Sequence, residues 1–92
     1  MDINSVPMVR VTWRDARDME TGWRDIKDII TAPLAVCQEV GWMVVNNDEK
    51  IVIMRSWCLD RDDNHGGGAI ALPKGWITKI EYLQVGHADV RN

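Results

Sequence analysis

The run Ala69–Ile80, AIALPKGWITKI, decides the fold because it holds two apolar, strand-like segments separated by a proline and a very short break. Pro73 cannot donate a backbone hydrogen bond to a neighbouring strand, so a strand that reaches it ends there. Residues 74–76 are enough for one tight turn of 3₁₀ helix. The run therefore predicts two consecutive strands joined by a single 3₁₀ turn, the second of them over residues 77–83.

Three further strands are predicted earlier in the chain. Residues 8–13, MVRVTW, alternate between apolar and polar side chains, as in a half-buried strand. Residues 34–45 form a long apolar run, in which Gly41 interrupts the alternation and indicates a bulge or bend. Residues 51–58 are rich in β-branched side chains and predict a central strand. Five short strands suit a small closed barrel better than a flat sheet, whose edges would be exposed.

A long connection, residues 14–33, separates the first predicted strand from the second. Connections of this length inside a small domain are usually functional. Ile26, Ile29 and Ile30 have helical spacing, so we expect one or two turns of helix there, ended by Pro33.

Residues 71–77, ALPKGWI, resemble the Ala-Leu-Pro-x-x-aromatic-Val/Ile segment of SH3 domains. The resemblance implies a mainly β fold, a five-stranded SH3-like barrel. It also implies that the long connection corresponds to the first, long loop of that fold. The Ala-Leu-Tyr-Asp-Tyr signature of signalling SH3 domains is absent from residues 8–13, so ordinary proline-peptide binding is not expected. On this basis residues 1–7 form a flexible leader, 8–83 the barrel and 84–92 a tail.

A second resemblance rests on residues 13–16 (WRDA), 22–23 (GW) and 40–42 (VGW). These look like segments of short accessory proteins encoded by tailed bacteriophages. The resemblance implies a viral accessory protein, and it implies no particular chemical activity.

Composition limits the location and the partners of the protein. The formal net charge of −3 disfavours binding to nucleic acid, which needs a basic face. No apolar run approaches the roughly 20 residues that cross a bilayer. The first residues lack the basic and apolar regions of a secretion signal, so we expect a cytoplasmic protein with reduced cysteines and no membrane partner.

The candidate site lies where the long connection and the 3₁₀ turn are expected to flank one groove. Trp23, Pro73 and Trp76 would line it, and the aromatic faces there could stack on a peptide, a base or a flat ligand. Asp25 and Asp28 would add negative charge suited to a basic partner. The alternative is that Trp23 and Trp76 simply close the core beneath the long connection.

Metal, cofactor and catalytic sites are not predicted. Asp60, Asp62 and Asn64 have the spacing of calcium ligands, but His65 occupies the place where the calcium loop needs glycine. The two cysteines, at positions 37 and 58, are expected to be small buried thiols that face each other across two strands. They share no zinc-binding spacing with each other or with the histidines.

The function that these features favour is a non-enzymatic protein-interaction module that binds a host or phage protein. Two alternatives remain. One is a small-ligand binder, for instance a protein that sequesters nucleotides between subunits, which stacking tryptophans would favour; the residues that could bind phosphate are Arg10, Arg14, Arg24 and Arg55. The other is a small barrel that binds nucleic acid. Small barrels often pair, so a symmetric homodimer is favoured over a monomer.

Overall fold

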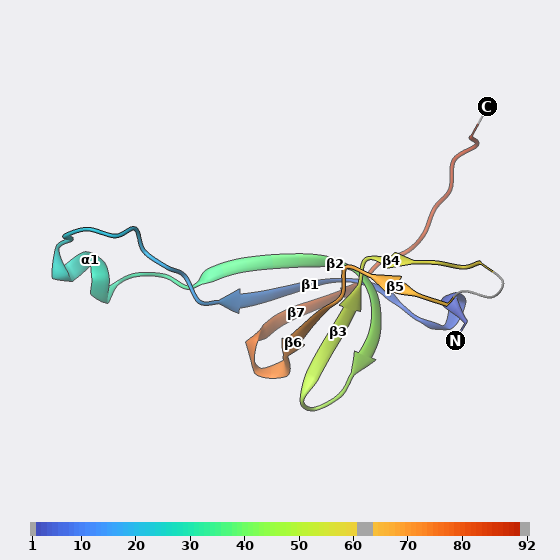
Figure 1. The fold of residues 1–92 in the computed structure, drawn as a ribbon, viewed down its shortest axis with the longest axis horizontal. Helices are drawn as coiled ribbons and strands as arrows, with labels where there is room; N and C mark the ends of the chain where they lie inside the picture. Colours follow the sequence, from blue (N-terminus) through green and yellow to red (C-terminus); the bar gives the residue numbers. More distant parts are fainter. Residues whose placement is uncertain (1, 61–63, 91–92) are drawn as a thin grey trace.

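The computed structural model describes residues 2–60 and 64–90, and the chain is mainly β. Five antiparallel strands form one sheet in the order β6-β3-β2-β1-β7 (Figure 1). Their bounds are β1 (Met8–Asp15), β2 (Ala35–Asn46), β3 (Lys50–Met54), β6 (Ile70–Pro73) and β7 (Ile77–Tyr82). Two short strands, β4 (Ser56–Trp57) and β5 (Gly66–Gly67), pair in a small second sheet.

The corner between the last two long strands is a 3₁₀ turn, as the sequence predicts. Turn η2 (Lys74–Trp76) follows Pro73 directly and leads straight into β7. The backbone N–H of Lys74 donates to the carbonyl of Glu49 at 2.9 Å, and the N–H of Ile77 closes the turn onto the carbonyl of Lys74. These bonds fix the chain as it crosses from one edge of the sheet to the other.

The sheet is not a closed barrel, and this corrects the prediction. β6 and β7 are its two edges, and in the described part of the chain no strand pairing joins them. Leu72 of β6 packs in the core cluster, and Ile77 and Ile80 of β7 pack against that cluster. Apolar side chains and the three residues of η2 therefore connect the two edges, in place of a hydrogen-bonded ladder.

The predicted strand over residues 51–58 is divided in two. β3 ends at Met54, and the N–H of Arg55 donates to Gly67 at 3.2 Å. Ser56 and Trp57 then pair with Gly67 and Gly66. This turn takes the chain away from β2, so the expected position of Cys58 opposite Cys37 is wrong, and both thiols are half-buried.

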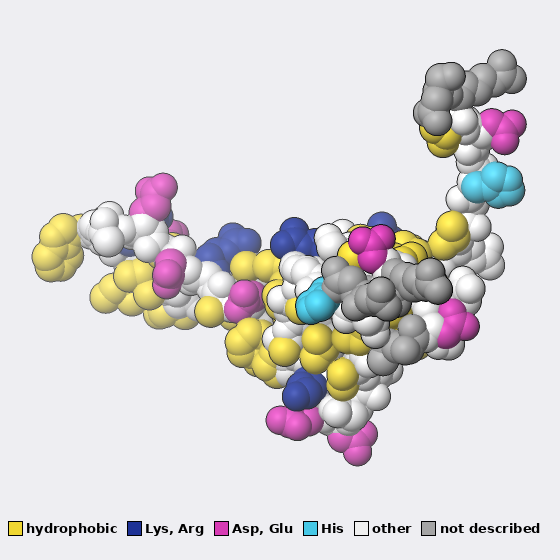
Figure 2. Space-filling view, turned by 45° about the vertical axis from the view of Figure 1, so that its right-hand side comes forward, with side chains coloured by type: hydrophobic (Ala, Val, Ile, Leu, Met, Phe, Trp, Pro, Cys, Tyr) yellow, Lys and Arg dark blue, Asp and Glu magenta, His cyan; other side chains and the backbone are white. Residues whose placement is uncertain are grey.

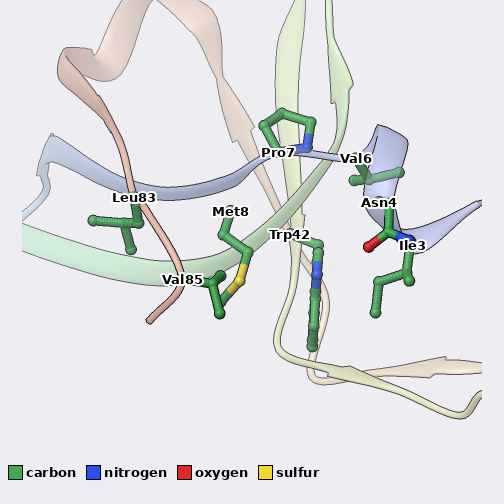
Figure 3. A pocket seen from close by; sticks show the side chains of 8 residues that line it. All are labelled: Ile3, Asn4, Val6, Pro7, Met8, Trp42, Leu83 and Val85. Carbon is green, nitrogen blue, oxygen red and sulfur yellow. The ribbon is translucent and has the colours of Figure 1, made fainter. Parts of the chain in front are cut away.

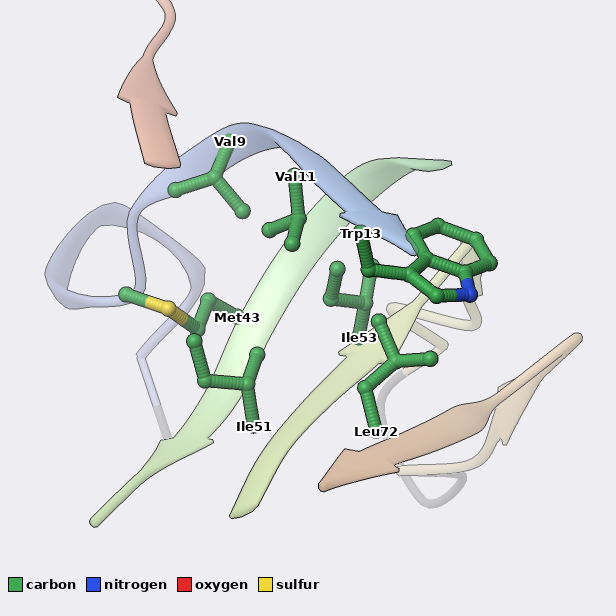
Figure 4. Packing of buried hydrophobic residues seen from close by; sticks show 7 residues of the cluster. All are labelled: Val9, Val11, Trp13, Met43, Ile51, Ile53 and Leu72. Carbon is green, nitrogen blue, oxygen red and sulfur yellow. The ribbon is translucent and has the colours of Figure 1, made fainter. Parts of the chain in front are cut away.

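The core lies on one face of the sheet (Figure 4). Alternate residues of each strand point to this face, which is why the buried set has the period of two expected for strands. Its members are Val9, Val11, Trp13, Met43, Ile51, Ile53 and Leu72.

Gly41 lies where β2 passes closest to the end of β3. A Cβ atom at this position would meet the carbonyl oxygen of Met54 at 2.5 Å and Cγ2 of Ile53 at 2.7 Å. The bulge itself lies further along the strand, between Met43 and Val45. Gly41 therefore allows β2 and the end of β3 to approach closely, and it is not the bulge residue.

A projecting segment, residues 16–34, connects β1 to β2 and is called the arm below (Figure 1). It contains helix α1 (Ile26–Ile30), which confirms the predicted short helix. The radius of gyration is 18.1 Å, whereas a compact chain of this length would have about 12 Å. Much of the chain therefore lies outside the packed body.

The ends of the chain add little regular structure. A 3₁₀ turn, η1 (Ile3–Ser5), precedes β1, and residues 84–90 contain no helix or strand. None of the helices in the described ranges is long and apolar enough to cross a membrane.

Replacing Gly41 with alanine is expected to lower the free energy of unfolding by about 1–3 kcal/mol, because the added methyl group meets backbone atoms that cannot move aside. Urea unfolding followed by tryptophan fluorescence measures the change. Gly75→Ala is the matched control, since nothing lies within 4 Å of its Cβ position. Equal effects of the two substitutions would contradict the close approach.

Candidate functional site

The arm carries apolar side chains that no other part of the described chain covers. Trp23 is fully exposed, and Ile26 and Ile30 of α1 are 70% and 75% exposed. Figure 2 shows hydrophobic surface along this projection. Large apolar side chains gathered on one exposed segment are typical of a surface that another molecule covers.

Charged groups accompany this apolar surface. Asp25 precedes α1, and its carbonyl accepts the backbone N–H groups of Asp28 at 3.0 Å and Ile29 at 3.3 Å. The carboxylate of Asp25 makes no capping hydrogen bond and Asp28 is also exposed, so both charges can meet a partner. The guanidinium of Arg24 lies 3.6 Å from the carboxylate of Glu20, and this exposed ion pair contributes little to the free energy of unfolding.

The five predicted site residues do not share one groove. Trp76 lines a hollow of about 470 Å³ at the base of the arm, together with Arg14, Asp15, Ala16, Leu34, Gly75 and Thr78. Pro73 borders a separate, smaller hollow beside Lys50 and Leu72. Trp23, Asp25 and Asp28 lie near α1, at the far end of the arm (Figure 1). The arm projects from the body instead of folding over the 3₁₀ turn, which separates the two groups.

The alternative reading, in which Trp23 and Trp76 close the core, is wrong. Trp23 is fully exposed and Trp76 is 47% exposed. Among the tryptophans it is Trp13 that enters the core. Trp42 and Trp57 meet edge to face with their ring centres 5.8 Å apart, and the indole N–H of Trp57 donates to Asn64 at 2.9 Å.

A second hollow, of about 440 Å³, was not anticipated from the sequence (Figure 3). It lies between the residues that precede β1, the outer face of β2 and the start of the tail. Its lining is Ile3, Asn4, Val6, Pro7, Met8, Trp42, Leu83 and Val85. The sequence feature that could have predicted this hollow is the presence of apolar residues in the two segments that we expected to be a flexible leader and a tail.

Within residues 2–60 and 64–90, no group of three or more histidine, cysteine or acidic side chains is arranged to hold a metal ion. The calcium-like spacing includes Asp62, which lies outside the described residues. Cys58 and His65 are neighbours across the β4–β5 hairpin, where the N–H of Cys58 donates to the carbonyl of His65 at 2.8 Å.

One ion pair joins β1 to β7 on the solvent face of the sheet. The Arg10 guanidinium donates to both carboxylate oxygens of Glu81, each at 2.9 Å. These hydrogen bonds lower the pKa of the Glu81 carboxyl and raise the pKa of Arg10, against a smaller opposing effect of desolvation. The pair ties the chain's first and last long strands together.

Comparison of the chain with protein-family models, with curated proteins and with solved structures finds no match.

Because the pKa of the Glu81 carboxyl is lower in the folded state than its ordinary value, its contribution to stability is fully present above that ordinary value. The contribution is lost as the pH falls through the lowered pKa. We expect Glu81→Gln to reduce the loss of stability between about pH 6 and pH 3, measured by urea unfolding at a series of pH values. Arg10→Gln should reduce it similarly, since the same bond is removed. An unchanged pH profile in both variants would rule out this contribution.

Proposed function

We propose that this protein is a non-enzymatic protein-interaction module whose arm, residues 16–34, is the contact element for a protein partner. The exposure of Trp23, Ile26 and Ile30 on one projecting segment carries this proposal. Burying such side chains releases about 25 cal/mol for each Å² of apolar surface removed from water. An arm with three large uncovered apolar residues can therefore supply the centre of an interface.

The charges on the arm indicate the chemistry of the partner. Asp25 directly precedes α1, Asp28 lies in its first turn, and both are exposed. A partner surface with an apolar groove and basic residues at its rim would match this arrangement. Charge complementarity at a rim acts mainly on the association rate and on specificity, while the buried aromatic residue supplies most of the affinity.

The strand order and the one-turn connection through η2 support an SH3-like arrangement, with the arm in the position of the long first loop. An origin as a tailed-bacteriophage accessory protein, acting in the host cytoplasm, remains part of the proposal. It rests on the sequence motifs at residues 13–16, 22–23 and 40–42.

Trp23→Ala is expected to weaken partner binding at least about tenfold, because tryptophan is among the side chains that most often dominate the affinity of an interface when they become buried in it. The same substitution should change the free energy of unfolding by less than about 0.5 kcal/mol, since Trp23 is fully exposed in the isolated chain. A partner first captured from host lysate would be purified and titrated calorimetrically against both proteins.

Val90→Ala is the matched control, because Val90 is also exposed and apolar but lies in the tail. It should leave the affinity unchanged. If Trp23→Ala and a combined Ile26→Ala, Ile30→Ala variant both bind the partner as tightly as the native chain, the arm is not the contact element.

A second candidate function is nucleotide binding in the hollow at the base of the arm. Trp76 and Arg14 line the same hollow, so an aromatic face and a guanidinium for phosphate lie together there. Its volume of about 470 Å³ is in the range of small-molecule sites. Three other arginines considered for phosphate, Arg10, Arg24 and Arg55, each already lie beside a carboxylate.

If the hollow binds nucleotides, millimolar ATP or GTP should raise the melting temperature by several degrees, because the ligand stabilises only the folded state. Trp76→Ala and Arg14→Ala should each remove the increase. The absence of any shift over a panel of nucleoside mono-, di- and triphosphates would exclude this second function.

A further inference from the structure

The first half of β2 is an unpaired sheet edge. β2 pairs with β1 over Ala35–Trp42, but its pairing with β3 begins only at Trp42, because β3 ends at Met54 and the chain turns away at Arg55. Within the described chain, residues 35–41 thus pair with a strand on one side only. In Figure 1 this half of β2 runs along the upper rim of the sheet, with no strand above it.

The hydrogen-bonding groups that face this edge can be identified from the register. The N–H of Met43 donates to the carbonyl of Pro7 at 2.9 Å, so the odd-numbered residues of this part of β2 bond to β1. In an antiparallel strand the direction of the backbone groups alternates. The N–H and C=O groups of Val36, Gln38 and Val40 therefore point to the unpaired side, and in the described part of the chain none of them meets a strand there.

We propose that this edge pairs with the same edge of a second copy, forming a symmetric antiparallel dimer with a continuous sheet centred on Gln38. The limits of the edge select this centre. Pairing cannot extend before Ala35, where β2 begins, or beyond Gly41, where β3 takes over the edge. Gln38 is the midpoint of residues 35–41, so a two-fold axis at Gln38 allows all seven residues to pair with the second copy.

The same register matches the side chains. With Gln38 opposite its own copy, Val36 of one chain lies opposite Val40 of the other on the solvent face of the sheet. These valines are 66% and 46% exposed in the single chain. On the other face Glu39 lies opposite Cys37, so no two like charges meet, and Glu39 keeps Arg55 beside it at 3.6 Å. In this register Val36, Gln38 and Val40 each occupy a hydrogen-bonded position opposite the second copy. Each of their outward-facing N–H and C=O groups therefore gains a partner.

The other two edges of the sheet carry features that prevent such pairing. β6 has four residues and ends at Pro73, and β7 presents the exposed Lys79. Short length, proline and lysine are common means of blocking an edge strand. Residues 35–41 contain neither proline nor lysine, so this is the edge suited to association.

The dimer goes beyond the proposed partner binding, because it uses a different surface. The two arms leave the joined sheet at opposite ends of the paired segment, so one dimer would present two arms. A seven-residue edge is a small contact, for which we expect a dissociation constant in the micromolar range.

Sedimentation velocity over about 5–200 µM protein should show a monomer–dimer equilibrium. Gln38→Pro removes the central N–H in both chains at once, without removing a bond to β1, and should raise the dissociation constant at least about tenfold. Gln38→Ala is the matched control. Like the proline variant it loses the side-chain hydrogen bond to Thr12 at 3.2 Å, but it keeps the N–H, so it should still dimerise.

A cysteine pair tests the register even if the proline variant does not fold. In a Cys37→Ser, Cys58→Ser background, Gln38→Cys should form a disulfide-linked dimer under mild oxidation, because paired Cα atoms lie about 5.5 Å apart. Val36→Cys should not, since its own copy would be roughly 13 Å away along the strand. A protein that stays monomeric at about 200 µM, or equal cross-linking of both variants, would overturn the proposal.

Failure of the dimer and failure of partner binding by the arm give different results. Gln38→Pro should still bind the partner through a single arm, whereas Trp23→Ala should still dimerise. Each proposal is therefore tested by a different variant.

Discussion

The structure depends on the pairing of β1 with β2, which extends beyond every other pairing in the sheet. It covers all of β1, from Met8 to Asp15, whereas β7 pairs only with residues 9–13 of β1 and β3 only with the second half of β2. Inside the body, β1 contributes Val9, Val11 and Trp13 to the core. Beyond residue 13 of β1, no third strand of the described chain pairs with these two strands, and they lead into the arm.

This arrangement explains why an unpaired edge and an uncovered apolar arm occur side by side. A two-stranded ribbon without further strands is only marginally stable in water. Here it is anchored at one end by the core and by the Arg10–Glu81 pair, and no third strand of the described chain pairs with its other end. A second copy along residues 35–41 and a partner on the arm would each add a neighbour where the single chain has none.

Several features were predictable because they depend on local sequence. Pro73 and the three residues after it predicted the 3₁₀ turn, since proline ends a strand and three residues allow only a tight turn. The spacing of Ile26, Ile29 and Ile30 predicted a short helix, which α1 confirms. That helix buries none of its residues, however, because the pattern shows an apolar face and does not show what covers it.

The sequence by itself determined the approximate positions of the five long strands, the corner at residues 74–76 and the apolar character of the arm, because backbone constraints and side-chain alternation act over a few neighbours. Only the tertiary structure decided that the sheet stays open, that β3 ends at Met54, and that Trp23 lies far from Trp76. These depend on contacts between distant segments: the close approach at Gly41, the core side chains between β6 and β7, and the β1–β2 hairpin. No local pattern specifies how such contacts compete, so the free edge of β2 became visible only once the register was known.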